Sequence, residues 1–232
     1  GTIYYGGSCS SSTTSATAGN ITINFTTLSD GTYSNCTLYV TSSTGVKGKI
    51  LSVTSFTVDT TAPTANYSAA TDNVGAVTGT LTSGNTTDDT ALALTGTNEA
   101  GSSVKVYNGS TELGSATVSG TSWSYSATVA NGTTYQFNVK ETDLAGNTSA
   151  ATINFAVTGD TTAPSVSSFT LSDTALKASE TATVTLVFSE AVASFSSAAD
   201  ITADNGTLAT MTSADNITWA GTFTPTANTE DD

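Results

Sequence analysis

The chain has 232 residues, of which 5 are lysine, none is arginine or histidine and 19 are acidic, giving a formal net charge of −14. Five lysines cannot neutralise a phosphate backbone, which excludes electrostatic nucleic-acid binding, and without histidine any metal site must use oxygen ligands. Hydrophobic residues make up 37% of the chain, enough to fill cores, which excludes simple acidic disorder.

The first sixty residues carry both cysteines, Cys9 and Cys36. They are either two free thiols or one disulfide. The composition is typical of an extracellular protein and the chain has no Cys-x-x-Cys pair, which favours the disulfide. Such a bond would stabilise the fold by about 3–4 kcal/mol in the chain-entropy model. In the same segment, residues 21–25 alternate apolar and polar side chains and predict a strand.

Alternation of apolar and polar residues continues along the chain. It is clearest at residues 104–107, 123–129, 135–140 and 183–188, and each stretch predicts a strand with one buried face. Asn-Gly pairs predict tight turns between strands, because glycine and asparagine adopt positive φ easily. No segment shows a sustained 3.6-residue stripe, and no apolar run approaches the 18 residues of a membrane span. The predicted class is all-β.

One motif divides the chain. Asp-Thr-Thr-Ala-Pro occurs at residues 59–63 and again at 160–164, a period of 101 residues. A period of about 100 residues with several short strands is typical of an immunoglobulin-like sandwich, and proline favours an extended linker. We therefore expect Ig-like domains at 1–59, 60–159 and 160–232. Only the middle one spans a full period; the first is expected to lack its opening strands and the last its closing strands.

Two explanations fit this division. The chain is either a piece of a longer array of repeats or a subunit whose sandwiches are completed by strands from neighbouring copies. An incomplete sandwich exposes sheet edges, which favours association in either case.

Several motifs together resemble a known family. Besides the two linkers, they are Leu-Thr-Gly-Thr-Asn-Glu-Ala-Gly at residues 94–101, Thr-Asp-Leu-Ala-Gly-Asn-Thr-Ser at 142–149 and Phe-Ser-Glu-Ala-Val at 188–192. In this order they resemble the bacterial immunoglobulin-like repeats of large secreted surface adhesins, including biofilm-associated and RTX-type ones. The resemblance implies tandem stalk domains on the bacterial cell surface, often stiffened by Ca²⁺ between neighbours.

The acidic residues allow a separate argument for calcium. In an Ig-like sandwich the chain enters at the end that also holds the B–C and F–G loops. Residues 91–97 are the expected second strand, which places Glu99 in the B–C loop, and residues 135–142 are the expected sixth, which places Asp143 and Asn147 in the F–G loop. With Asp59 from the linker, these oxygens suit Ca²⁺, which takes 6–8 oxygen ligands.

The same reasoning predicts further cation ligands. Asp160 in the second linker and Glu190 after residues 183–188 occupy the equivalent positions at a second junction. Asp88 and Asp89 precede the second strand and could form another site at the far end with Asp72. The alternative for these residues is turn chemistry, since Asp and Asn commonly bond their own backbone. In the first segment, residues 41–46 carry no acid in the F–G position, so a site there is not expected.

Catalysis is not expected, because the chain has no Ser/His/Asp set and no phosphate-binding loop. We expect a non-enzymatic stalk segment of an adhesin, whose partners are neighbouring Ig-like domains of the same or adjacent chains. Other regions of the protein would contact a host, cell or abiotic surface. The alternatives are a filament or sheath subunit that uses strand exchange, and a glycan- or ice-binding module.

Overall fold

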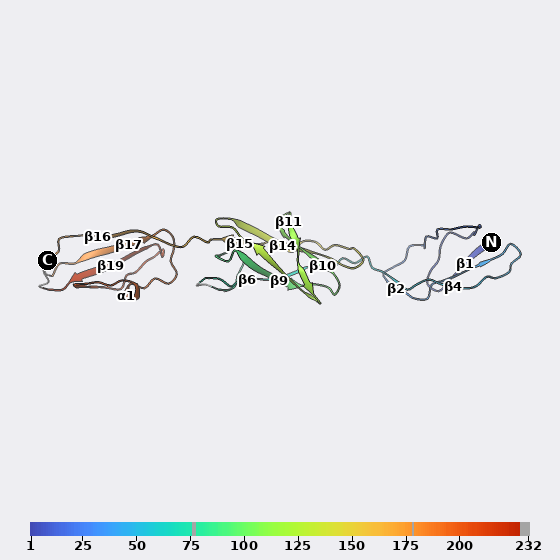
Figure 1. Cartoon of the computed structure of the whole chain (residues 1–232), viewed down its shortest axis with the longest axis horizontal. Coiled ribbons are helices and arrows are strands. Elements are labelled where there is room, and N and C mark those ends of the chain that lie inside the picture. Colours follow the sequence, from blue (N-terminus) through green and yellow to red (C-terminus); the bar gives the residue numbers. More distant parts are fainter. Residues whose placement is uncertain (76–77, 178, 228–232) are drawn as a thin grey trace. The chain divides into compact units, whose positions relative to one another are not determined.

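The computed structural model describes residues 1–75, 78–177 and 179–227. The chain divides into two compact units, Gly1–Thr161 and Thr162–Asp232. Both consist of strands, and the described residues contain one short helix, α1 (Ser197–Asp200), so the predicted all-β class is confirmed (Figure 1). No helix in the described part of the chain is long and apolar enough to cross a membrane.

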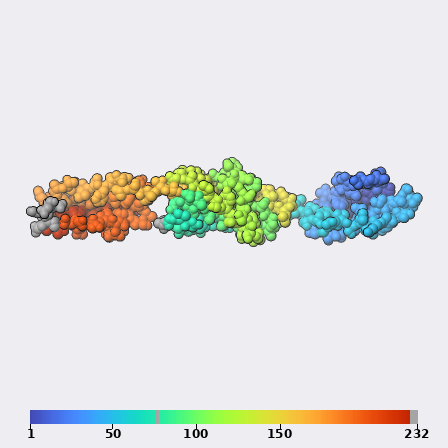
Figure 2. Space-filling view, viewed as in Figure 1, coloured from blue at the N-terminus to red at the C-terminus, as the bar shows by residue number. Residues whose placement is uncertain are grey.

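Residues 60–159, hereafter the middle sandwich, form two five-stranded sheets with the strand orders β11-β10-β14-β15-β8 and β12-β13-β9-β6-β7. The strands are β6 (Asn66–Asp72), β7 (Gly79–Thr80), β8 (Asn85–Thr87), β9 (Ala91–Thr97), β10 (Ser103–Asn108), β11 (Thr111–Ser115), β12 (Thr117–Ser119), β13 (Ser122–Thr128), β14 (Thr134–Thr142) and β15 (Phe155–Gly159). In the space-filling view these residues, cyan-green to yellow, pack into one body (Figure 2).

The core of the middle sandwich is built from alternate residues of facing strands. Leu92 and Leu94 of β9, Val106 of β10, and Phe137 and Val139 of β14 are fully buried in one hydrophobic cluster. The period-2 alternation therefore marked the inward faces correctly, because successive side chains of a strand point to opposite sides of the sheet. The predicted strands at 91–97 and 135–142 match β9 and β14 within one residue.

The N-terminal segment, residues 1–59, forms two small sheets, ordered β1-β3-β4 and β2-β5. The strands are β1 (Thr2–Gly6), β2 (Gly31–Tyr33), β3 (Thr37–Thr41), β4 (Leu51–Ser52) and β5 (Phe56–Val58). Cys9 and Cys36 form the predicted disulfide with a Cα–Cα distance of 5.3 Å. Both half-cystines are buried and, with Ile3, make up the buried apolar residues of this segment.

The strand predicted at residues 21–25 is wrong. These residues form no strand, although Ile23 and Phe25 are half-buried, as the alternation suggested. Their backbone has no neighbouring strand to pair with. Instead, Thr26 N donates to Ser10 O at 2.8 Å and Ser11 Oγ donates to Asn24 O. Alternation thus identified a half-buried face, but a strand also needs a partner for its backbone groups.

The C-terminal unit, Thr162–Asp232, has one four-stranded antiparallel sheet with the order β16-β17-β19-β18. The strands are β16 (Val166–Leu171), β17 (Ala182–Phe188), β18 (Gly206–Leu208) and β19 (Thr218–Pro225). Its core contains Val184, Leu186 and Met211, with partly buried aromatic residues packed against them. β16 lies at one edge of the sheet, and all six of its residues are exposed. The strand predicted at 183–188 corresponds to β17.

Candidate functional site

Acidic residues gather at the end of the middle sandwich where the chain enters. β14 positions two of them, because Glu141 lies on its inward face and Asp143 follows its last residue, Thr142; both side chains are buried. Asp143 Oδ1 accepts a hydrogen bond from Asn147 N at 2.9 Å, and Oδ2 accepts one from Asn147 Nδ2 at 2.8 Å. The side-chain bond from Asn147 is the main reason that the pKa of Asp143 lies below its ordinary value.

Asn147 also connects this loop to the linker. Its Nδ2 donates to the backbone O of Asp59 at 3.0 Å. The Asp59 side chain is engaged locally, since Oδ1 accepts from Thr61 N at 3.0 Å, in keeping with the turn-chemistry alternative. Three of the four predicted junction residues, Asp59, Asp143 and Asn147, are therefore joined by hydrogen bonds.

Glu99, the fourth predicted residue, takes part through its backbone. Its N–H donates to Glu141 Oε1 at 2.5 Å, while its side chain is exposed. The B–C loop thus reaches the same end of the sandwich as the F–G loop. The backbone of Glu99 therefore lies beside the other acids. It is the main chain of Glu99, and not its carboxylate, that contacts them.

Glu141 is the residue that the sequence reasoning missed. It is fully buried, Oε1 also accepts from Ser102 Oγ at 2.6 Å, and Oε2 is buried with no hydrogen-bond partner. A buried carboxylate oxygen without a partner is costly, which makes this position unusual for a structural residue. The signal was present: Glu141 interrupts the inward apolar positions of β14 after Phe137 and Val139, and Val40 stands 101 residues earlier.

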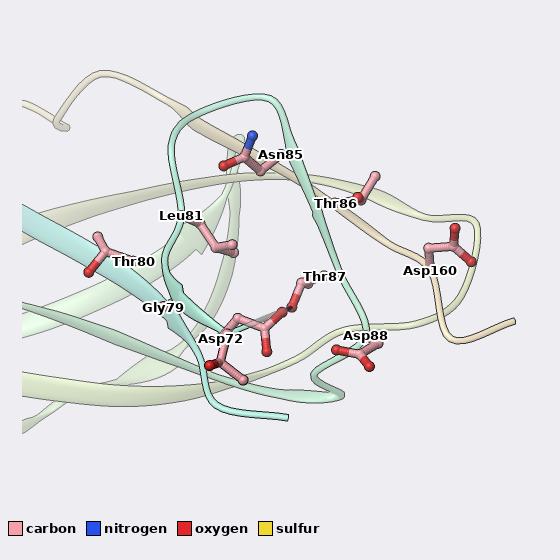
Figure 3. Close-up of a pocket in the computed structure, with 10 residues that line it drawn as sticks. Asp72, Gly79, Thr80, Leu81, Asn85, Thr86, Thr87, Asp88 and Asp160 are labelled. Atoms are coloured by element: carbon pink, nitrogen blue, oxygen red, sulfur yellow. Dashed lines mark hydrogen bonds between the residues drawn. The ribbon is translucent and has the colours of Figure 1, made fainter. Parts of the chain in front are cut away.

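A second acidic group lies at the opposite end, around a pocket of about 410 Å³. Asp72, Thr87, Asp88 and Asp160 are among the residues that line it (Figure 3). The Asp72 carboxylate is buried; Oδ2 accepts from Thr87 Oγ1 at 2.7 Å and Oδ1 from Val74 N at 3.0 Å. Asp160 is attached to the same wall, since its N–H donates to Thr87 O at 2.8 Å.

The structure places Asp72 and Asp88 in the lining of one pocket and adds Asp160, which the sequence placed with Glu190. Asp89 is buried outside the pocket lining; Oδ1 accepts from Ala91 N at 2.8 Å and Oδ2 is buried without a partner. Glu190 belongs to the C-terminal unit, where it is half-buried and its Oε1 is buried without a partner.

The two acidic ends share one chemistry. Within the described ranges no lysine pairs with Asp59, Glu99, Glu141 or Asp143, and the ion pair of the sandwich is Lys105–Glu112 on its outer surface. Within the same ranges, no three His, Cys, Asp or Glu side chains are grouped so that they could hold a metal ion. The metal-binding atoms available at either end are carboxylate, amide and backbone oxygens, which are the ligand types that suit Ca²⁺.

Two family models match the chain. One model described as "Bacterial Ig-like domain" matches residues 63–161, and a second with the same description matches residues 160–232. Their common boundary coincides with the second Asp-Thr-Thr-Ala-Pro linker. The comparison with curated proteins gives no match.

Proposed function

Because the chain belongs to the bacterial Ig-like repeat proteins, we propose that it is an extender segment of a bacterial surface adhesin. Bacterial Ig-like domains are generally structural domains of extracellular or surface proteins rather than enzymes. The observation that carries the proposal is the Asp-Thr-Thr-Ala-Pro linker that repeats after 101 residues, with its second copy at the boundary between the two compact units. The segment would set the distance between the cell and an adhesive region elsewhere in the protein, and so support adhesion or biofilm formation.

Calcium at the entering end is the finer part of the proposal. Its support is the buried, unpartnered Oε2 of Glu141, two residues before the buried Asp143, at an end where no lysine of the described chain pairs with either acid. Asp59, Glu99, Glu141 and Asp143 would hold the ion, with the side-chain oxygen of Asn147. Their side chains would have to turn towards one another on binding, because within the described ranges they are not grouped closely enough to hold a metal ion as they lie. Bound Ca²⁺ would neutralise these carboxylates and tie the linker to the B–C and F–G loops.

The far-end group is proposed as a second calcium position. Asp72, Asp88 and Asp160 line one pocket, and the buried Asp89 lies next to Asp88 in the chain. This position has less support, because both Asp72 oxygens already accept hydrogen bonds and Asp89, whose Oδ2 has no partner, is not among the residues that line the pocket. Glu190, which occupies the position of Glu99 in the C-terminal unit, would be a ligand at the entering end of that unit.

Calorimetry of the chain with excess EDTA or saturating Ca²⁺ tests the calcium proposal. Binding at about 100 times Kd adds about 2.7 kcal/mol to the folded state, so the melting temperature of the middle sandwich should rise in Ca²⁺. Glu141→Gln should reduce this rise, whereas Glu112→Gln, an exposed change on β11, should keep it. A melting temperature equal in EDTA and Ca²⁺ would reject calcium and leave the extender role intact.

The extender role has its own test in cells. Replacing this segment by an equally long array of unrelated Ig-like domains should preserve adhesion, because a spacer contributes length and not recognition. Deleting the segment should weaken adhesion to a distant surface. Loss of adhesion after the equal-length replacement would show that the segment itself recognises a ligand, as a glycan- or ice-binding module would.

A filament subunit is the second candidate, and β16 favours it. This strand is an edge of its sheet, and it exposes the apolar side chains of Val166 (58%) and Phe169 (51%). Exposed edge strands with apolar residues pair readily with strands of other chains. Sedimentation across a range of concentrations separates the two candidates: the extender predicts a constant monomer mass, and the filament predicts a mass that grows with concentration.

A further inference from the structure

The first linker is held by an acidic side chain outside the predicted sites. Asp30, in the turn before β2, accepts three hydrogen bonds from the linker. Its Oδ1 accepts from Thr60 N at 3.1 Å and from Thr60 Oγ1 at 2.7 Å, and its Oδ2 accepts from Thr61 Oγ1 at 3.0 Å. One carboxylate thus holds two consecutive residues immediately after the last strand of the N-terminal segment, β5.

The same contact recurs one period later in the middle sandwich. Asn131 Oδ1 accepts from Thr161 N at 2.8 Å. Asp30 and Asn131 are 101 residues apart, as are Thr60 and Thr161. In both places an Asp or Asn that precedes a glycine receives the backbone N–H of the residue after the linker aspartate. The same hydrogen bond is therefore made by Asp in one repeat and by Asn in the next. This recurrence indicates a structural feature of the repeat rather than a chance surface contact.

The position of this side chain explains what the bond can control. Asn131 precedes β14 and forms an isolated parallel bridge with Gly159, the last residue of β15. The turn is anchored there, because Gly132 N donates to Gly159 O at 2.8 Å. A bond from this turn to Thr161 therefore fixes the backbone two residues beyond the final strand, at the point where the chain changes from sheet to linker.

We propose that Asp30 and Asn131 act as clasps that set the direction in which each linker leaves its own domain. At the first linker the opposite side is also bonded, since Asn147 Nδ2 donates to Asp59 O. Residues on both sides of the first linker therefore hold it through direct protein contacts. This device is separate from the proposed calcium positions, because neither Asp30 nor Asn131 is one of their ligands.

Amide hydrogen exchange, followed residue by residue by NMR on the whole chain, tests the clasps. In Asn131→Ala, the N–H of Thr161 should exchange about tenfold faster, as expected for loss of one hydrogen bond, while that of Thr60 stays unchanged. Asp30→Ala should show the reverse pattern. Asn131→Asp should preserve protection of Thr161, because Asp30 performs the same task with a carboxylate. Asn20→Ala, at an exposed asparagine of the N-terminal segment, is the matched control and should alter neither amide.

Each variant is measured in EDTA and in Ca²⁺, and the core amide of Val139 reports whether the sandwich remains folded. Protection of both linker amides in EDTA supports the clasps. If EDTA abolished the protection of these amides in the wild-type protein, bound metal rather than Asp30 and Asn131 would hold the linkers, and the proposal would be overturned. Unchanged exchange of Thr161 in Asn131→Ala with a protected core would also overturn it.

Discussion

The side-chain nitrogen of Asn147 donates a hydrogen bond to the backbone oxygen of Asp59, a residue 88 positions earlier in the chain, at 3.0 Å. The same nitrogen donates to Asp143 Oδ2, so one amide links the F–G loop to the linker. Direct protein hydrogen bonds thus hold the linker aspartate beside Asp143. They also mean that Asn147 influences both the linker and the protonation of Asp143.

Replacing Asn147 should raise the pKa of Asp143 towards its ordinary value of 3.8. The Asn147 side chain is the largest cause of the lowered pKa, and Asn147→Ala removes it while keeping the backbone bond from residue 147. The measurement is an NMR titration of the Asp143 carboxyl carbon. Asp215, whose pKa is lowered mainly by backbone bonds from Thr218 and Ile217, should titrate identically in both proteins. An unmoved Asp143 titration would refute this account of its environment.

Acidification should release the first clasp and leave the second intact. The pKa of Asp30 lies below its ordinary value of 3.8, chiefly because of side-chain bonds from Thr60 and Thr61. A lowered folded pKa means that the contribution is complete above the ordinary pKa and is lost as the pH falls through the lowered one. Protection of the Thr60 amide should therefore decrease below about pH 4. Thr161 should keep its protection, since Asn131 does not titrate; parallel loss at both amides would contradict the prediction.

Reducing the disulfide should unfold the N-terminal segment alone. Cys9 and Cys36 supply two of its three buried apolar side chains, and the closed loop accounts for about 3–4 kcal/mol in the chain-entropy model. The double variant Cys9→Ser with Cys36→Ser should lose the ordered amide signals of β1 and β3, while those of β9 and β14 persist. Loss of all signals would show that the middle sandwich depends on its neighbour for stability.

Gly75→Ala should destabilise the middle sandwich by about 1 kcal/mol. Gly75 has φ of +74°, which favours glycine, and an added Cβ would clash with Asp88 Oδ2. Urea unfolding measures the loss. Gly109→Ala is the informative comparison, because its φ is also positive, +58°, but its Cβ would meet no atom within 4 Å. Equal losses would show that backbone strain alone, rather than contact with Asp88, governs the position.

Strands with strong alternation, such as β9 and β14, could be predicted from the sequence, because a half-buried strand has apolar residues at every second position. The disulfide between the two cysteines and the positions of the two linkers could also be predicted from the sequence. The strand prediction at residues 21–25 failed because alternation indicates that one face is buried but does not show whether the backbone has a neighbouring strand to pair with. The α1 turn was not foreseen, since four residues are too short to show a helical period.

Contacts between distant residues were harder to predict. Asn147 and Asp59 could be placed together because the Ig-like topology fixes which loops meet. Glu141 was missed because a charged residue at an inward strand position reads as a surface residue until its burial is known. The bonds of Asp30 and Asn131 were missed for another reason: both residues stand before glycines, and turn chemistry already explained them.

The parallel pairing of β8 with β15 has a mechanical consequence. Asn85, Thr86 and Thr87 lie opposite Val157, Thr158 and Gly159 in register. When the two ends of the middle sandwich are pulled apart, β8 is drawn back towards the N-terminus and β15 forward towards the C-terminus. Their hydrogen bonds are then loaded together in shear and cannot open one after another. Single-molecule stretching should show one high force peak for this domain, and Thr86→Pro, which removes a backbone donor, should lower it. In such a domain the strand pair that shares the tension lies directly at the second linker, since β15 ends at Gly159 and Asp160 N donates to Thr87 O.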